Sequence, residues 1–279
     1  MTKEKEPRSL NNLNVDQIRA FAQQGDVNAQ YLLGELLRTG EGVERDLAES
    51  ARWLRAAAQQ DHAWAANNLG LMYHNGAGVA QDFKEAAQLF KRAAEQGLPE
   101  GQSNLALMYC SGHGVRQDFK EANRLFKQAA EEGLAEAQNS LGGLYFHGHG
   151  VEENFLEAAS WYEEAAGNGH AGAAYNLALM FYNGHGVRQD FNRAISLFEE
   201  AAEGGAPEAA YNLGVMHQNG VGVEASDDQA VEWFYKAGKI YLALGMREPA
   251  SEAASAIEST IAGHPLAQKL LAEIFGDDE

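Results

Sequence analysis

The chain has 279 residues, and its 40 acidic and 21 basic side chains give a net charge of −19 at pH 7. This charge argues against nucleic acid and anionic membranes as ligands, because binding to phosphates requires clustered Lys and Arg. The single cysteine, Cys110, excludes an intramolecular disulfide. No apolar run approaches the ~20 residues of a membrane span, so the sequence predicts a cytoplasmic protein.

The first predicted segments precede any repeat. Residues 1–12 are charged, lack the apolar core of a secretory signal, and are predicted to be disordered. Residues 13–24 are predicted to form a short helix with Ile18, Phe21 and Ala22 on one face. We expect this helix to cap the N-terminal end of the structure that follows.

A period of 36 residues runs through residues 25–240. A Gly-x-Gly-Val motif recurs at this step without insertion, and its valines are Val43, Val79, Val115, Val151, Val187 and Val223. Columns of leucine and alanine keep the same step. The chain therefore contains six repeats of 36 residues, which is the length of a helical hairpin.

Each repeat is predicted to form two helices. Pro99 and Pro207 lie in the first turn of the first helix, where proline is tolerated. The second helix follows an N-cap residue type in every repeat, and a Glu or Gln three positions later predicts a capping box in five of the six. These N-caps are Asp46, Asp82, Asp118, Asn154, Asp190 and Ser226. Because one hairpin cannot bury its apolar face alone, the hairpins are expected to stack as an all-α solenoid.

The pattern loosens in residues 241–279. An apolar segment ends at Gly245, and two further helical segments are separated by His264 and Pro265. We expect a hairpin, a C-terminal capping helix and an acidic tail in this stretch.

The pattern A-x-x-x-L-G-x-x-Y-x-x-G-x-G-V-x-x-D, followed by L-F or W-Y and A-A, resembles the Sel1-like repeat, a relative of the tetratricopeptide repeat. Residues 65–94 show it nearly complete, and the match covers all six repeats. The stretch from Ala230 to Pro265 is more similar to a tetratricopeptide unit. The resemblance implies a right-handed α/α superhelical solenoid that serves as an adaptor or scaffold for other proteins.

The first helix of each repeat is expected to line the concave groove of such a solenoid. Six positions of this helix face away from its core side, equivalent to residues 28, 31, 32, 35, 38 and 39. Across six repeats these 36 positions hold ten asparagines and six aromatic residues but only five charges. The groove is therefore predicted to be rich in amides and aromatic rings. Its predicted partner-binding residues are Asn68, Asn104, Asn176, Asn212, Trp64, Tyr175, Tyr182 and Tyr211.

The asparagine row has two interpretations. An Asn side chain both donates and accepts, so a row with a spacing of ~10 Å could pair with every third peptide unit of an extended ligand. Alternatively, the amides tie each helix to a neighbouring loop or side chain. The sequence does not decide between them.

Histidines and Cys110 are candidate metal ligands by residue type. His113, His149 and His185 occupy equivalent loops, but neighbouring loops lie ~10 Å apart and a zinc ion needs ligands at ~2.0–2.3 Å. Exposed loop histidines are the favoured interpretation, and no metal and no cofactor are expected. Cys110 has no evident base and is interpreted as a small helix residue.

Three functions fit this pattern. The first is a non-enzymatic adaptor or scaffold, a monomer that binds a protein or peptide partner, basic by charge complementarity, in the concave groove. The second is a neutralising protein of the immunity type for a toxin. The third is a hydrolase-like enzyme, but no Ser/His/Asp or paired-carboxylate arrangement stands out against the repeat.

Overall fold

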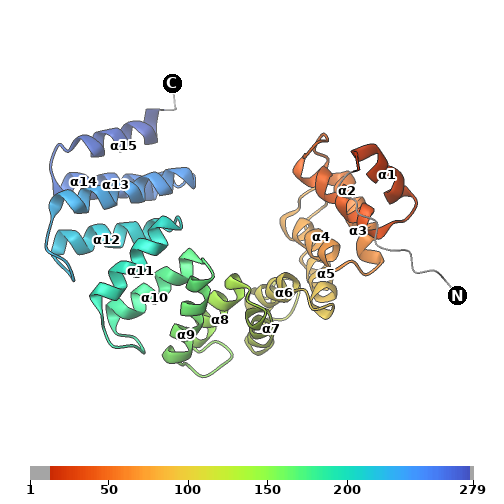
Figure 1. Ribbon diagram of the computed structural model, residues 1–279, viewed down its shortest axis with the longest axis horizontal. Helices are drawn as coiled ribbons and strands as arrows, with labels where there is room; N and C mark the ends of the chain where they lie inside the picture. The colour runs from red at the N-terminus through yellow and green to blue at the C-terminus, as the bar shows by residue number, and fades with distance from the viewer. Residues whose placement is uncertain (1–12, 277–279) are drawn as a thin grey trace. The chain divides into compact units, whose positions relative to one another are not determined.

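The structure is a computed structural model that describes residues 13–276, and these residues form fifteen α-helices and no strand (Figure 1). The predicted disordered N-terminus, residues 1–12, and the end of the predicted acidic tail, residues 277–279, lie outside the described residues. Within residues 13–276, no helix is both long and apolar enough to cross a membrane. The chain divides into two compact units, residues 1–132 and 133–279.

The first unit is a series of helices in which each packs on the next. A short helix, α1, precedes three hairpins of 13-residue helices. In Figure 1 this unit runs from red through orange to yellow-green. Its helices are α1 (Val15–Gln23), α2 (Val27–Thr39), α3 (Leu47–Gln59), α4 (Ala63–Asn75), α5 (Phe83–Glu95), α6 (Pro99–Ser111) and α7 (Phe119–Glu131).

The second unit continues the same alternation with three hairpins and then departs from it. Helix α13 has 17 residues instead of 13 and runs past residue 240, where the sequence places the end of the sixth repeat. Helix α15 packs on both α13 and α14. The helices of this unit are α8 (Ala135–His147), α9 (Phe155–Gly167), α10 (Ala171–Asn183), α11 (Phe191–Glu203), α12 (Pro207–Asn219), α13 (Asp227–Ala243), α14 (Arg247–Thr260) and α15 (Pro265–Phe275).

The predicted N-caps are confirmed at all six second helices, where the Asp, Asn or Ser side chain accepts a backbone N–H of the first turn. The predicted capping boxes are wrong. The backbone N–H of each N-cap already donates to a carbonyl near the end of the first helix, as Asp82 does to Tyr73 at 3.0 Å. The glutamates are therefore released for other partners, and Glu49 accepts from Arg19 and Trp53 instead. Among the described helices, the reciprocal box forms only at α1, between Asn14 and Gln17.

The core of each hairpin depends on a close contact between its two helices. A Cβ added to Gly70 of α4 would lie 2.7 Å from the ring of Phe90 on α5, and Gly214 meets Phe234 in the same way at 2.6 Å. Both phenylalanines are 1% exposed. The small residue thus makes room for the largest core side chain of the second helix, which leaves the opposite side of the first helix available for other contacts.

Candidate partner-binding surface

The side of each first helix that faces away from its hairpin core is called the first-helix face. It belongs to α2, α4 and α6 in the first unit and to α8, α10 and α12 in the second. The four predicted asparagines and the three predicted tyrosines are half-buried on these faces, and Trp64 is 42% exposed.

The asparagines form a regular ladder between neighbouring repeats. The side-chain amide of Asn104 donates to Asn67 Oδ1 at 2.8 Å, and that of Asn176 donates to Asn139 Oδ1 at 3.0 Å. Both bonds join residues that are 37 apart in the chain. Each bond thus joins a residue of one repeat to the residue one position before its equivalent in the preceding repeat.

The remaining two predicted asparagines follow the same offset. Asn68 lies beside the hydroxyl of Tyr31, and Asn212 lies beside that of Tyr175. Burial raises the pKa of Tyr175, and the neighbouring Asn212 amide partly offsets this rise. All four asparagines therefore make the inter-repeat contact that the structural interpretation of the row expects. Each amide has two N–H donors and one oxygen, so these bonds leave hydrogen-bonding capacity on the same side chains.

The three predicted tyrosines pack against the second helices. Tyr175 and Tyr211 contact Phe198 and Phe234, with ring centroids 5.8 and 5.0 Å apart. Tyr182 meets Phe191 edge to face at 5.5 Å. The three rings thus lie between the second unit's first-helix face and its second helices.

The first unit presents apolar side chains that its fold does not bury. Trp64 and Leu71 lie two turns apart on α4, and Leu107 occupies the position of Leu71 in the next repeat. They are 42%, 38% and 46% exposed. Sequence reasoning singled out Trp64 but missed the two leucines. The sequence does indicate them, because the position of Leu71 holds an aliphatic residue in four of the six repeats. The equivalent residues are Glu35, Leu71, Leu107, Gly143, Leu179 and Val215.

The second unit has a cavity of about 200 Å³ between α10 and α12. It brings together two predicted residues, Tyr182 and Asn212. The rest of its lining is mostly apolar, and the full set is Leu179, Tyr182, Asn183, Phe198, Asn212, Val215 and Met216.

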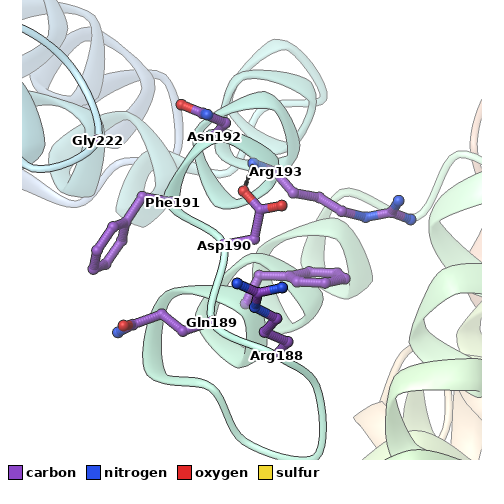
Figure 2. A pocket seen from close by; sticks show the side chains of 8 residues that line it. Arg188, Gln189, Asp190, Phe191, Asn192, Arg193 and Gly222 are labelled. Atoms are coloured by element: carbon purple, nitrogen blue, oxygen red, sulfur yellow. Dashed lines mark hydrogen bonds between the residues drawn. The ribbon is translucent and has the colours of Figure 1, made fainter.

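A larger and more polar depression of about 800 Å³ lies at the start of α11 (Figure 2). Two of its charged residues, Asp190 and Arg193, already serve the fold. Asp190 caps α11 by accepting from the backbone N–H of Arg193 at 3.0 Å. The Arg193 guanidinium lies 4.9 Å from the Phe181 ring centroid and donates to Glu163 at 2.5 Å. These contacts give Asp190 and Arg193, both labelled in Figure 2, a structural role.

The loop histidines are exposed, as predicted, but the rings of His113 and His185 each pack on the preceding repeat. His113 stacks on Phe83 with centroids 4.7 Å apart, and His185 stacks on Phe155 at 5.7 Å. In residues 13–276, no three His, Cys, Asp or Glu side chains gather as metal ligands. Burial raises the pKa of the Cys110 thiol, which disfavours the nucleophilic thiolate.

Comparison with known proteins agrees with this architecture. The model of the Sel1 repeat family matches six segments: residues 27–62, 65–98, 99–134, 135–170, 171–205 and 207–239. No curated protein matches the sequence.

Several solved structures share the fold. A Sel1 repeat protein from Oxalobacter formigenes is 29% identical, with a TM-score of 0.73, over 81% of this chain and 99% of its own. The protective antigen c5321 of uropathogenic Escherichia coli is 28% identical, with a TM-score of 0.69, over 96% of this chain, which spans 65% of that protein. The immunity protein Pa5087 of Pseudomonas aeruginosa is 20% identical, with a TM-score of 0.50, over 86% of this chain and 88% of its own. The first two matches confirm the predicted all-α solenoid class.

Proposed function

Because the chain belongs to the Sel1 repeat family, whose fold is typical of protein–protein interaction, we propose that it is a non-enzymatic adaptor that binds a protein or peptide on its first-helix faces. The observation that carries this proposal is the exposure of Trp64, Leu71 and Leu107 on α4 and α6. Large apolar side chains are normally buried, and three exposed ones on the corresponding faces of two neighbouring first helices suit an interaction site.

The spacing of these residues suits an extended contact rather than a single point. Trp64 and Leu71 are seven residues apart, which is about 10 Å along a helix. Leu107 lies on the neighbouring first helix at about the interaxial distance of packed helices, also ~10 Å. Between them, the amides of Asn68 and Asn104 offer donors and acceptors for a partner backbone.

The expected partner is basic. The net charge of −19 favours encounter with a cationic protein and disfavours nucleic acids and anionic membranes. Hydrogen-bonding amides and apolar side chains on the first-helix faces would then fix the bound position, while the surrounding acidic surface speeds association.

The experiment is calorimetric titration of the partner, isolated from the native host, against variants of the full chain. Trp64→Ala combined with Leu107→Ala is expected to weaken binding by roughly 30-fold or more, because a buried aromatic anchor contributes about 2 kcal/mol. The control is Leu156→Ala, since Leu156 is 69% exposed but lies on a second helix, α9. Loss of binding in the control, with the double variant unaffected, would refute the proposal.

A neutralising function of the immunity type is the second candidate. The strong negative charge favours it, because many toxins must bind anionic substrates and an acidic repeat protein could occupy a basic site. The likeness to the immunity protein Pa5087 is one of fold. The two candidates separate in one assay: an adaptor leaves the activity of its isolated partner intact, whereas a neutralising protein abolishes it at equimolar concentration.

A further inference from the structure

The cavity between α10 and α12 has the size and lining of a specificity pocket. We propose that it receives one bulky apolar side chain of a partner segment that carries a Lys or Arg about three residues away. This inference rests on the proposed function and names the chemistry of the segment that the second unit's first-helix face would select.

The volume fits one large apolar side chain. An apolar cavity of about 150 Å³ accommodates benzene, so about 200 Å³ accommodates a Leu, Met or Phe side chain. Phe198 and Met216 are 1% and 2% exposed and form the floor, whereas Leu179 and Val215 are half-buried at the sides. Methionine adapts its shape to different occupants, which allows the pocket to accept several apolar residues.

The same pocket carries amides that can hold the backbone around the anchor. The side chain of Asn183 donates to the Leu179 carbonyl at 2.9 Å, which leaves its oxygen to accept. Asn212 contacts the Tyr175 hydroxyl through one part of its amide. An extended peptide presents an N–H and a C=O on either side of each residue, so these two asparagines match the backbone next to an inserted side chain.

The position of the partner's Lys or Arg is inferred from an acidic residue of α12. Glu208, Asn212 and Val215 follow the i, i+4, i+7 spacing of one helix face. Glu208 is thus about 10 Å from Val215 along the helix, which an extended chain covers in about three residues. Glu208 is exposed and has no ion pair among the described residues.

Further groups make this end of the face suitable for a cation. Burial raises the pKa of Tyr241 to about 12, and the nearby carboxylates of Glu208 and Glu252 contribute to the rise. The carboxylates of Glu208 in α12 and Glu252 in α14 favour a positive charge at this end of the face. The lysines of α13 are engaged elsewhere, because Lys236 lies over the Trp233 ring and Lys239 pairs with Glu273.

The first unit supplies a matched comparison. Residue by residue, the pocket positions 179, 183, 198, 212 and 216 correspond to Leu71, Asn75, Phe90, Asn104 and Met108, all identical in type. The differences are Tyr182, which is His74 there, and Val215, which is Leu107. Valine is one methylene smaller than leucine, and Val215 lines the pocket. A larger residue at 215 should therefore close it without disturbing the fold.

The test uses two blocked tetrapeptides, acetyl-Leu-Ala-Ala-Lys-amide and acetyl-Lys-Ala-Ala-Leu-amide, one for each chain direction. They are titrated by NMR into the full chain, with signals of Val215 and Met216 followed. At least one is expected to bind with a dissociation constant of about 1 mM. Replacing its Leu by Ala, or its Lys by Glu, should weaken binding at least about tenfold.

Variants of the chain locate the effect. Val215→Phe should abolish peptide binding, Glu208→Gln should weaken it several-fold, and Leu156→Phe, on the exposed surface of the second helix α9, should leave it unchanged. The proposal is overturned if neither peptide shifts the Val215 and Met216 signals at about 10 mM, or if Val215→Phe binds as the parent does. Two results would refute the pocket proposal but not the adaptor function. The Val215→Phe chain would still bind the isolated partner, and the Trp64→Ala, Leu107→Ala chain would not.

Discussion

Replacement of Gly114 by alanine should destabilise the protein more than the same change at Gly97. Gly114 lies in the loop after α6 with φ of +70°, and an added Cβ would be 2.1 Å from the Phe83 carbonyl oxygen. That oxygen belongs to the backbone at the start of α5, so it cannot rotate away as a flexible side chain could. The loop and α5 would have to separate, which strains the contact between two neighbouring repeats.

The size of the effect follows from two contributions. A residue with a Cβ in the left-handed region costs about 1 kcal/mol, and overpacking adds roughly 1–3 kcal/mol. Gly97 has φ of +79° and nothing within 4 Å of its added Cβ, so it carries only the first contribution. We expect a loss of about 1 kcal/mol for Gly97→Ala and about 3 kcal/mol for Gly114→Ala.

Equilibrium unfolding in urea, followed by far-UV circular dichroism, measures both losses. Because repeat arrays can unfold in parts, hydrogen exchange of the peptide that contains Phe83 supplies a local readout. It should accelerate in Gly114→Ala and not in Gly97→Ala. Equal losses for the two variants would refute the tight contact between the loop and α5.

Three further predictions concern stability. Asn176→Ala with Asn212→Ala should lower the free energy of unfolding by about 1 kcal/mol per lost bond, and a urea midpoint equal to that of the parent would exclude a structural role for the ladder. The hydrogen bond from Arg19 lowers the pKa of Glu49, so this pair stabilises the fold above pH 4.5 and loses its effect on acidification. Arg19→Ala should therefore destabilise by up to about 1 kcal/mol at neutral pH and by progressively less as the pH falls below 4.5, and a loss that stays constant on acidification would contradict this. Burial raises the pKa of Tyr162 to about 12, so its contribution to stability is present below pH 10 and is lost towards pH 12. The unfolding midpoint of Tyr162→Phe should fall less steeply than that of the parent over this interval.

The repeat pattern predicts most of the fold because local chemistry specifies each hairpin. An Asp at position 118 caps a helix in any context, and Pro99 can only begin one. The predicted capping boxes do not form, because a contact with another helix already uses the backbone N–H of the N-cap residue. The N–H of Asp118 is occupied by the carbonyl of Tyr109 in the preceding helix, at 3.0 Å, and sequence spacing does not reveal that partner.

The candidate site was predictable only in part. The helical wheel assigns Asn104 and Asn176 to the first-helix faces of their own units, and their hydrogen-bond partners lie 37 residues back, one position off the repeat. That offset depends on how far one helix is shifted along its neighbour, which no single repeat encodes. The cavity at Val215 was missed because its lining comes from three helices, α10, α11 and α12, which the pattern of a single repeat does not bring together.

Hydroxyl-radical footprinting of the full chain, with and without its isolated partner, tests the central claim most directly. Exposed Trp and Leu side chains oxidise, so the molecule carries its own controls: Trp64 and Leu107 lie on first-helix faces, whereas Leu156 and Leu244 are 69% and 58% exposed away from them. The account predicts that the partner protects Trp64 and Leu107 and leaves Leu156 and Leu244 unchanged. Protection of Leu156 and Leu244, with Trp64 and Leu107 still oxidised at the free rate, would contradict it.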